Sequence, residues 1–189
     1  LGGPPDLGHT LSTLYNPLVQ RLRSLAKPVV CAVNGVAAGA GANIVFGCDI
    51  VLAATTAKFV QSFAKVGLIP DAGGTYHLAQ ILGPLRAKAW AMTATPITAQ
   101  TAQDWGLVWQ CFDPDALLKA AQQMTADLAK GATLGLAQTK HAIHKAGQMD
   151  LEAHMALEAE IQRACGQSAD YLEGVTAFLD KRPAQYSGS

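Results

Sequence analysis

A glycine-rich turn at residues 34–43 combines residues that could do chemistry. It contains Gly39-Ala40-Gly41, which carry almost no side chain, ahead of a predicted helix. The first amides of a helix have no partner within it, and with the axial dipole they favour negative charge. Such a turn can hold an anion, or an oxygen that becomes one during a reaction. The alternative is that small residues only let a helix pack closely on a strand.

A second turn, at residues 67–75, holds our candidate for an acid/base group, Asp71. Asp71 follows Pro70 in a loop and precedes the residues that open the next helix. The sequence alone leaves two roles open, an N-cap and a proton-transferring carboxylate. A helix N-terminus lowers the pKa of an acid and an apolar pocket raises it, so the basicity of Asp71 also stays open. His77 lies on a poorly matched helix face, and we predict no dyad with it.

Two other kinds of site are disfavoured by spacing. A dinucleotide-binding fingerprint would need a third glycine where Ile44 stands, and Asp49 and Asp71 are poorly placed for a ribose-binding acid. His141 and His144 share a predicted helix face, but the sequence offers no third ligand beside them. We therefore predict neither a dinucleotide site nor a metal site.

Strands alternating with helices should position the two turns, which predicts an α/β domain. Runs of β-branched and apolar residues predict strands at Val29–Val33, Ile50–Ala54 and Lys58–Val60. A helix should follow the first of these strands at once, and another should follow Asp71. Further helices are predicted at 10–26, 85–94, 98–103, 114–130, 132–145, 151–165 and 168–181, with a strand at 107–112 and a loop over the first eight residues.

The composition suits a single globular core. Half of the 189 residues are hydrophobic, and 14 basic residues balance 14 acidic ones. Neutral charge gives no reason to expect a nucleic-acid partner, and no apolar stretch is long enough to cross a membrane. Cysteines without metal-ligand spacing predict free thiols in a reducing cytoplasm. They are Cys31, Cys48, Cys111 and Cys165.

Blocks of the sequence also carry a family resemblance. They are, in order, Val33–Gly41, Cys48–Ala53, Phe59, Gly67–Thr75, Glu173–Val175 and Ala177–Arg182. In order and spacing they resemble the enoyl-CoA hydratase/isomerase, or crotonase, superfamily. Within it the chain is most similar to the phenylacetate-pathway isomerases, through Leu14–Val19, Ala37–Gly41, Lys65–Asp71 and Ser168–Tyr171. The resemblance covers nearly the whole chain and implies a crotonase-like spiral of βα turns, followed by a helical C-terminal region.

The resemblance assigns chemistry to both turns. It implies that the amide of Ala40 is one of two that grip a thioester oxygen, with Gly39 and Gly41 beside it in the substrate site. It also implies that Asp71 is the acid/base. A carboxylate that takes a proton beside the thioester carbonyl creates an enolate, and a pre-aimed amide stabilises the enolate oxygen.

Hydratases of the superfamily carry two glutamates that hold and activate water. Asn43 and Phe63 occupy the matching positions here, and we predict that both line the substrate site. Phenylalanine cannot transfer a proton, and asparagine can only position a polar group. We therefore expect isomerisation of a ring-1,2-epoxyphenylacetyl thioester to its oxepin form, or a 3-enoyl to 2-enoyl shift. The alternatives are a hydratase that uses Asp71 with Asn43, and a silent CoA-binding or assembly subunit.

The resemblance also bears on domains and partners. It implies a crotonase core at 1–130, lacking the family's N-terminal strands and their oxyanion amide, and a helical oligomerisation region at 131–189. It implies homotrimers, often paired into hexamers, and no metal or redox cofactor, because the substrate carries the CoA. Phe178 and Lys181 match a C-terminal pattern that contacts CoA. Their alternative is one packed aromatic residue and one solvated lysine.

Overall fold

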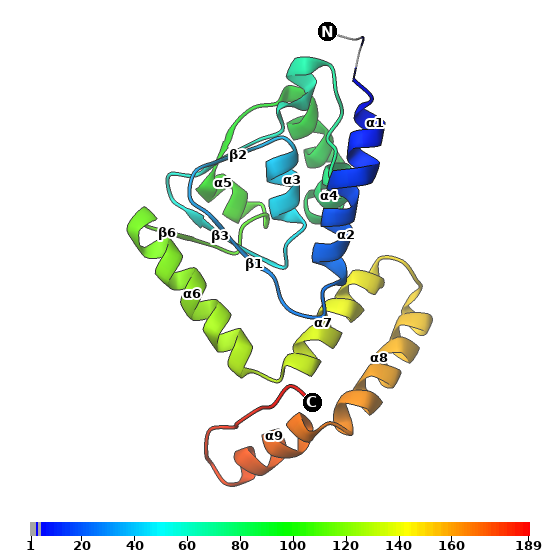
Figure 1. Ribbon diagram of the computed structural model, residues 1–189, viewed down its shortest axis with the longest axis vertical. Coiled ribbons are helices and arrows are strands. Elements are labelled where there is room, and N and C mark those ends of the chain that lie inside the picture. The colour runs from blue at the N-terminus through cyan, green and yellow to red at the C-terminus, as the bar shows by residue number, and fades with distance from the viewer. Residues whose placement is uncertain (1–2, 4) are drawn as a thin grey trace. The chain divides into compact units, whose positions relative to one another are not determined.

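The computed structural model describes Gly3 and residues 5–189, and it divides into two compact units. The first unit comprises Leu1–Arg23 and Val29–Ala121, and the second comprises Ser24–Pro28 and Gln122–Ser189. The first unit contains the strands and both glycine-rich turns, whereas the second is helical (Figure 1).

Short strands in the first unit form two three-stranded sheets. One sheet is parallel, in the order β1-β3-β6, and pairs Val30 with Ile50 and Leu52 with Gln110. In the other, β4 lies between β2, which is parallel to it, and β5, which is antiparallel. The bounds are β1 Val30–Val33, β2 Val36–Ala38, β3 Ile50–Ala54, β4 Lys58–Val60, β5 Ile97–Thr98 and β6 Gln110–Phe112.

The helices of this unit begin with three consecutive segments, α1 (Leu7–Thr10), a π-helical turn (Leu11–Tyr15) and α2 (Asn16–Ser24). Asp6 caps α1, because its carboxylate accepts the His9 N–H at 2.8 Å. The later elements are α3 (Ala40–Phe46), a 3₁₀ turn (Ser62–Val66), α4 (Gly74–Thr93), α5 (Ala99–Asp104) and α6 (Pro114–Lys130).

Helix α4 breaks at Gly83, whose φ of 71° and ψ of 161° are not helical. Pro84 follows, and its ring and missing N–H also disfavour a continuous helix. Beyond the break, Trp90 lies 6.1 Å from Phe46 and 6.1 Å from Trp105, measured between ring centroids. This aromatic cluster packs α4 on α3 and forms part of the core.

The ends of β2 and β4 position the first turn. The two strands are parallel neighbours, with Ala38 opposite Val60, so they end side by side. The Gly39 N–H donates to the Val60 oxygen at 2.9 Å and extends the pairing by one residue. Helix α3 then begins at Ala40, and the chain after Val60 enters the 3₁₀ turn. The first turn and the segment containing Phe63 therefore leave the sheet at the same edge.

The second unit consists of the end of α6, then α7 (Thr133–Ala146), α8 (Leu151–Gly166) and α9 (Ala169–Leu179). Side chains cap two of these helices: Asp150 accepts the Ala153 N–H at 2.8 Å, and Ser168 accepts the Tyr171 N–H at 3.0 Å. The buried Lys140 ammonium donates to the Lys27 oxygen at 3.2 Å, which fixes the segment 24–28 to α7.

The α/β class predicted from the sequence is confirmed, and the strands at 50–54 and 58–60 have the predicted bounds. The expectation that a helix directly follows the strand at 29–33 is wrong, because β2 lies between that strand and α3. The expected initial loop is wrong at Leu7 and Gly8, which are in α1, while residues 1, 2 and 4 lie outside the described residues. The predicted domain boundary follows Lys130, whereas the compact units divide after Ala121.

Candidate active site

The first turn presents the N–H of Ala40 at the start of α3. Gly39 is the N-cap residue, with a φ of 54° and a ψ of −129° that side chains strongly disfavour. The Gly39 N–H is already bonded to Val60. Among the described residues, no hydrogen bond occupies the N–H of Ala40, which is half-buried. Gly41, next in the helix, is exposed. The Ala40 amide is thus free to donate to a ligand oxygen.

Gly39 also makes room for Phe63. A Cβ atom at position 39 would lie 3.2 Å from Ser62 Oγ and 3.5 Å from Phe63 Cζ. The Phe63 side chain is buried, and its ring edge packs directly on the glycine. The helix start therefore has an apolar wall on one side. This arrangement brings together the predicted site residues Gly39, Ala40 and Phe63.

Asp71 begins a tight turn that leads into α4. The Gly74 N–H donates to the Asp71 main-chain oxygen at 2.7 Å. Between them, Ala72 and Gly73 both have positive φ, 47° and 79°. A left-handed conformation is uncommon for alanine and costs about 1–3 kcal/mol, so the surrounding packing must enforce it at the buried Ala72. Gly73 is the N-cap of α4, which removes the N-cap role considered for Asp71.

A buried amide pair holds this turn. Asn43, on α3, donates from Nδ2 to the Asp71 main-chain oxygen at 2.9 Å and accepts Gln61 Nε2 on its Oδ1 at 2.8 Å. Both amide side chains are fully buried. Gly74 packs on the Asn43 amide so closely that a Cβ atom at position 74 would overlap it. The structure thus brings Asn43 and Asp71 together through the main chain of Asp71.

The Asp71 carboxyl group has an unusual environment. Its Oδ1 atom is buried and has no hydrogen-bond partner within the described part of the chain. Burial raises the pKa of this carboxyl above its usual value, and a hydrogen bond from the backbone N–H of Asp71 opposes the rise. A carboxylate whose pKa is raised is a stronger base and a better general acid near neutral pH. An unpartnered acceptor is also ready to take a proton from a ligand.

His77 packs beneath the turn. A Cβ atom at Gly73 would lie 3.1 Å from His77 Nε2, and one at Gly47 would lie 3.4 Å from it. The imidazole is 5% exposed. His77 therefore fills space between α3 and the Asp71 turn.

An apolar cavity of about 360 Å³ lies between the 3₁₀ turn and α4, also in the first unit. It is lined by Leu68, Ile69 and Pro70 on one side and by Ala87, Lys88 and Met92 among others on α4. Asp71 and Ala40 are not among its lining residues. Pro70 connects the cavity to the Asp71 turn through the chain.

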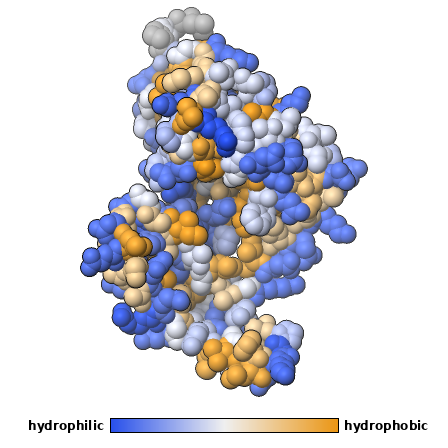
Figure 2. All heavy atoms as spheres, turned by 180° about the vertical axis from the view of Figure 1, so that it is seen from behind, coloured by the Kyte–Doolittle hydropathy of each residue, from blue (hydrophilic) through white to orange (hydrophobic). Residues whose placement is uncertain are grey.

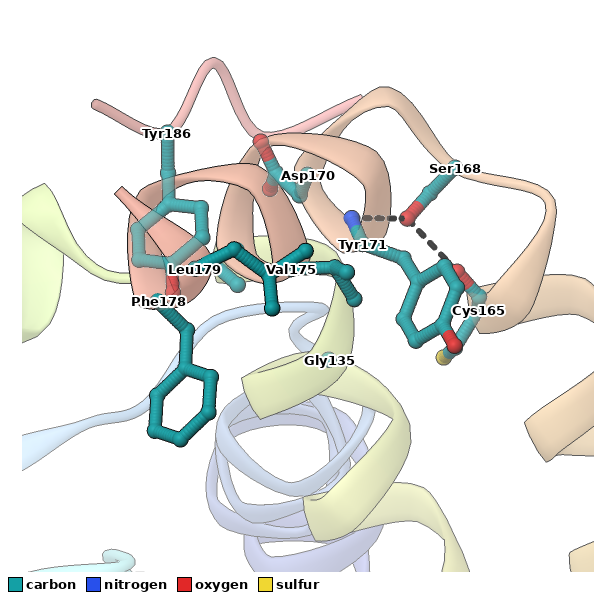
Figure 3. Close-up of a pocket in the computed structure, with 11 residues that line it drawn as sticks. Gly135, Cys165, Ser168, Asp170, Tyr171, Val175, Phe178, Leu179 and Tyr186 are labelled. Atoms are coloured by element: carbon teal, nitrogen blue, oxygen red, sulfur yellow. Dashed lines mark hydrogen bonds between the residues drawn. The ribbon is translucent and has the colours of Figure 1, made fainter. Parts of the chain in front are cut away.

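Phe178 and Lys181 belong to the second unit. Phe178 is 82% exposed and lines a cavity of about 400 Å³, together with Val175 and Leu179 from α9 and Tyr186 from the tail (Figure 3). Lys181 follows α9 with a positive φ of 55°. The exposed apolar side chains of α9 form an orange patch at the lower end of Figure 2. The exposed Phe178 lacks the packed position that its alternative role requires. Lys181 is exposed, as its alternative role of a solvated lysine requires.

Sequence reasoning missed three residues that shape this site, namely Gln61, Ala72 and Gly74. Gln61 carries a signal, since it is a polar residue between the apolar Val60 and Phe63. Gly74 lies in a glycine pair that was treated only as a helix start. Ala72 carries no signal, because alanine ordinarily avoids positive φ.

Among the described residues, no three His, Cys, Asp or Glu side chains lie close enough together to hold a metal ion. No helix within residues 5–189 is long and apolar enough to cross a membrane.

Comparisons with known proteins show the family of the chain. Residues 5–189 match the family model described as enoyl-CoA hydratase/isomerase. The chain is 50% identical over 187 residues, 99% of its length and 71% of the relative's, to the 1,2-epoxyphenylacetyl-CoA isomerase of Escherichia coli. It is 44% identical to a probable enoyl-CoA hydratase of Rhodobacter capsulatus, covering 97% of this chain and 71% of the relative.

A solved structure has the same fold. An enoyl-CoA hydratase from Polaromonas sp. JS666 superposes with a TM-score of 0.92 at 35% sequence identity, covering 97% of this chain and 71% of that one. The crotonase-like fold expected from the resemblance is therefore confirmed. By sequence and by fold, the chain belongs to the enoyl-CoA hydratase/isomerase family of enzymes.

Proposed function

We propose that this protein is an acyl-CoA isomerase in which Asp71 carries a proton between carbons of a CoA thioester. The observation that carries the proposal is the Asp71 carboxyl group, which has a buried, unpartnered oxygen and a raised pKa. It is linked through Asn43 to the helix that begins with the free Ala40 amide. The name of the 50% identical relative supports a 1,2-epoxyphenylacetyl thioester as substrate. A 3-enoyl to 2-enoyl shift is a second reaction of the same class.

The chemistry balances with one carboxylate. Asp71 removes a proton from the carbon beside the thioester carbonyl, and the electrons of the C–H bond move onto the thioester oxygen. The Ala40 N–H donates a hydrogen bond to that oxygen as its charge develops. The enolate electrons then return, the carbonyl re-forms, the double bonds shift, and the protonated Asp71 gives the proton to another carbon of the acyl group. With the epoxide substrate, the C–C bond shared by the two rings also opens to give the seven-membered oxepin ring. Nothing is added to the substrate or lost from it, so the step needs no water, metal or redox cofactor.

Hydration is the alternative, because other relatives are named hydratases. It would require a second group that holds water. Asn43 is poorly suited to that task, since its side chain is fully buried and both its amide oxygen and nitrogen are already bonded. Phe63 offers no polar atom. These features favour isomerisation.

The test is proton exchange in deuterated water, with 1,2-epoxyphenylacetyl-CoA and a 3-enoyl-CoA as substrates and the full natural chain as enzyme. We expect conversion to the isomer, with deuterium in the product to the extent that the Asp71 carboxyl exchanges its proton with solvent before returning it. Asp71→Asn should lower turnover by roughly a hundredfold or more. Asp115→Asn, which changes an exposed aspartate of α6, is the matched control and should keep the original rate. Incorporation of ¹⁸O from labelled water would indicate a hydratase instead. Thioester binding with neither conversion nor exchange would indicate a silent binding subunit.

We also propose that the protein forms homotrimers or pairs of trimers and works in the cytoplasm. Support for the assembly comes from the family resemblance and from exposed apolar side chains on α9, namely Leu172, Val175, Phe178 and Leu179. Light scattering coupled to size exclusion would report three or six chains per particle. A monomer at micromolar concentration would contradict this assembly.

A further inference from the structure

Asn43 has no route to a ligand, yet it contacts both halves of the proposed active site. Its side chain is 0% exposed, and the bonds of its amide go to the Asp71 main-chain oxygen and to Gln61. It is also three residues after Ala40 in α3. A substrate contact, as predicted from the sequence, is therefore not what this geometry favours.

We infer that Asn43 is a positioning residue, which with Gln61 fixes the Asp71 carboxylate relative to the Ala40 amide. This inference rests on the proposed function, because it assumes that Asp71 is the proton carrier. Asn43 acts through the main chain of Asp71 and touches no reacting atom itself.

The orientation of the Asn43 amide is set from two sides. Gln61 donates to Oδ1, so the donor end, Nδ2, must face the Asp71 oxygen. Gly74 packs against the same amide and leaves no room for a side chain of its own. Because the amide is enclosed on both sides, it cannot rotate without breaking a buried hydrogen bond.

The other end of the contact is equally constrained. The Asp71 oxygen accepts a second hydrogen bond, from the Gly74 N–H at 2.7 Å, and the turn between them holds Ala72 at positive φ. A strained turn keeps its conformation only when its surroundings enforce it. The Asn43 bond is a side-chain contribution to that enforcement, and it connects the turn to α3. Positional accuracy matters here, because a displacement of about 1 Å can cost roughly a hundredfold in rate.

Asn43→Asp is the informative variant, because it keeps the size of the side chain and removes the N–H donor. In its ionised form the new side chain can only accept hydrogen bonds, so it cannot hold the Asp71 oxygen. We expect turnover in the deuterium-exchange assay to fall by roughly ten- to a hundredfold, with the KM for the thioester within about threefold of the original. Gln61→Leu should give a smaller loss of turnover, again with the KM within about threefold of the original.

The matched control is Asn34→Asp, which makes the same substitution at an exposed position in the loop before β2. It should leave turnover unchanged. Thermal unfolding of every variant should be followed, so that rates are compared only at temperatures where each variant is folded.

A double-mutant cycle separates positioning from general damage. If Asn43 acts through the Asp71 carboxylate, Asn43→Asp should cause no further loss in a chain that already carries Asp71→Asn. The inference would be overturned if Asn43→Asp lowered turnover by the same factor in the original chain and in the Asp71→Asn chain. It would also be overturned if Asn43→Asp alone kept turnover within twofold of the original. If Asp71→Asn itself keeps full turnover, the proposed function fails and the inference fails with it. These three results are distinguishable in one set of measurements.

Discussion

The Asn43 Nδ2 atom donates to the Asp71 main-chain oxygen at 2.9 Å, and this hydrogen bond joins helix α3 to the turn before α4. The same helix begins with Ala40, whose N–H has no partner among the described residues. The proposed base and the proposed oxyanion donor are thus attached to one rigid element.

The pH dependence of turnover should report the Asp71 carboxyl. Burial raises its pKa above the usual value of 3.8, and only the ionised form can take a proton from the substrate. Turnover should therefore rise with pH through this raised pKa and then level off. A pH–rate profile measured where the protein stays folded is the check. A rate that stays constant down to about pH 4 would remove Asp71 from the rate-limiting step.

Asp71→Asn should stabilise the protein at neutral pH. A carboxyl whose pKa is higher in the folded chain than in the unfolded chain loses folding stability as pH rises through these two values. The neutral asparagine avoids that loss. The variant should have an equal or higher melting temperature at pH 7, and the difference should vanish in acid, where Asp71 is protonated in both states. A clear destabilisation at pH 7 would contradict the burial cost assigned to this carboxylate.

Gly74→Ala should destabilise the fold. The added Cβ atom would overlap the buried Asn43 amide, and overpacking of this kind costs about 1–3 kcal/mol. Gly135→Ala is the matched control, because a Cβ atom there meets open space inside α7. It should stabilise the chain by about 0.5–1 kcal/mol. Urea unfolding of both variants gives the comparison, and equal free energies of unfolding would refute the close packing at Gly74.

Glu173→Gln should loosen the C-terminal tail. The Glu173 carboxylate accepts two hydrogen bonds from Arg182, at 2.7 and 2.9 Å, and one from the Gln185 N–H at 2.7 Å. The pKa of the Glu173 carboxyl is lowered to about 2, and the hydrogen bonds from Arg182 are the largest cause. Because the folded pKa is lowered, the contact is complete above the usual value of 4.5 and is lost as pH falls toward 2.

Hydrogen exchange at the Gln185 amide is the measurement for the tail. Exchange should be faster in Glu173→Gln than in the original chain. In the original chain it should become faster in acid, and also with added salt, because salt screens an exposed ion pair. Glu160→Gln, at an exposed position of α8, is the control. Identical exchange in the three proteins would show that another contact retains the tail.

The elements with strong local signals were predictable from the sequence. Helix α6 begins at Pro114, and β3 is a continuous apolar run, so both have the predicted bounds. Strand β2 was missed because Val36–Ala38 is only three residues long and lies within a glycine-rich stretch. Its pairing with β4, more than twenty positions away, is a tertiary contact without a local signal.

The candidate site was predictable in part. Asp71 and Ala40 were identified through the family resemblance, and the structure gives each an unoccupied polar group. The Asn43 contacts were not predictable, because they join residues 18 and 28 positions apart. The positive φ of Ala72 runs against the preference of alanine, so only the folded surroundings account for it.

The contact between positions 43 and 71 also limits how the chain can change its chemistry. An ionised acid at position 43, where the resemblance implies a glutamate in hydratases, would have no N–H for the Asp71 oxygen. Such a substitution would release the proposed base, Asp71, while Phe63 still occupied the position that the resemblance assigns to the second glutamate. The first step toward water addition would therefore lower the old activity before any new activity appeared. Evolution or engineering between the two reactions has to change these positions together.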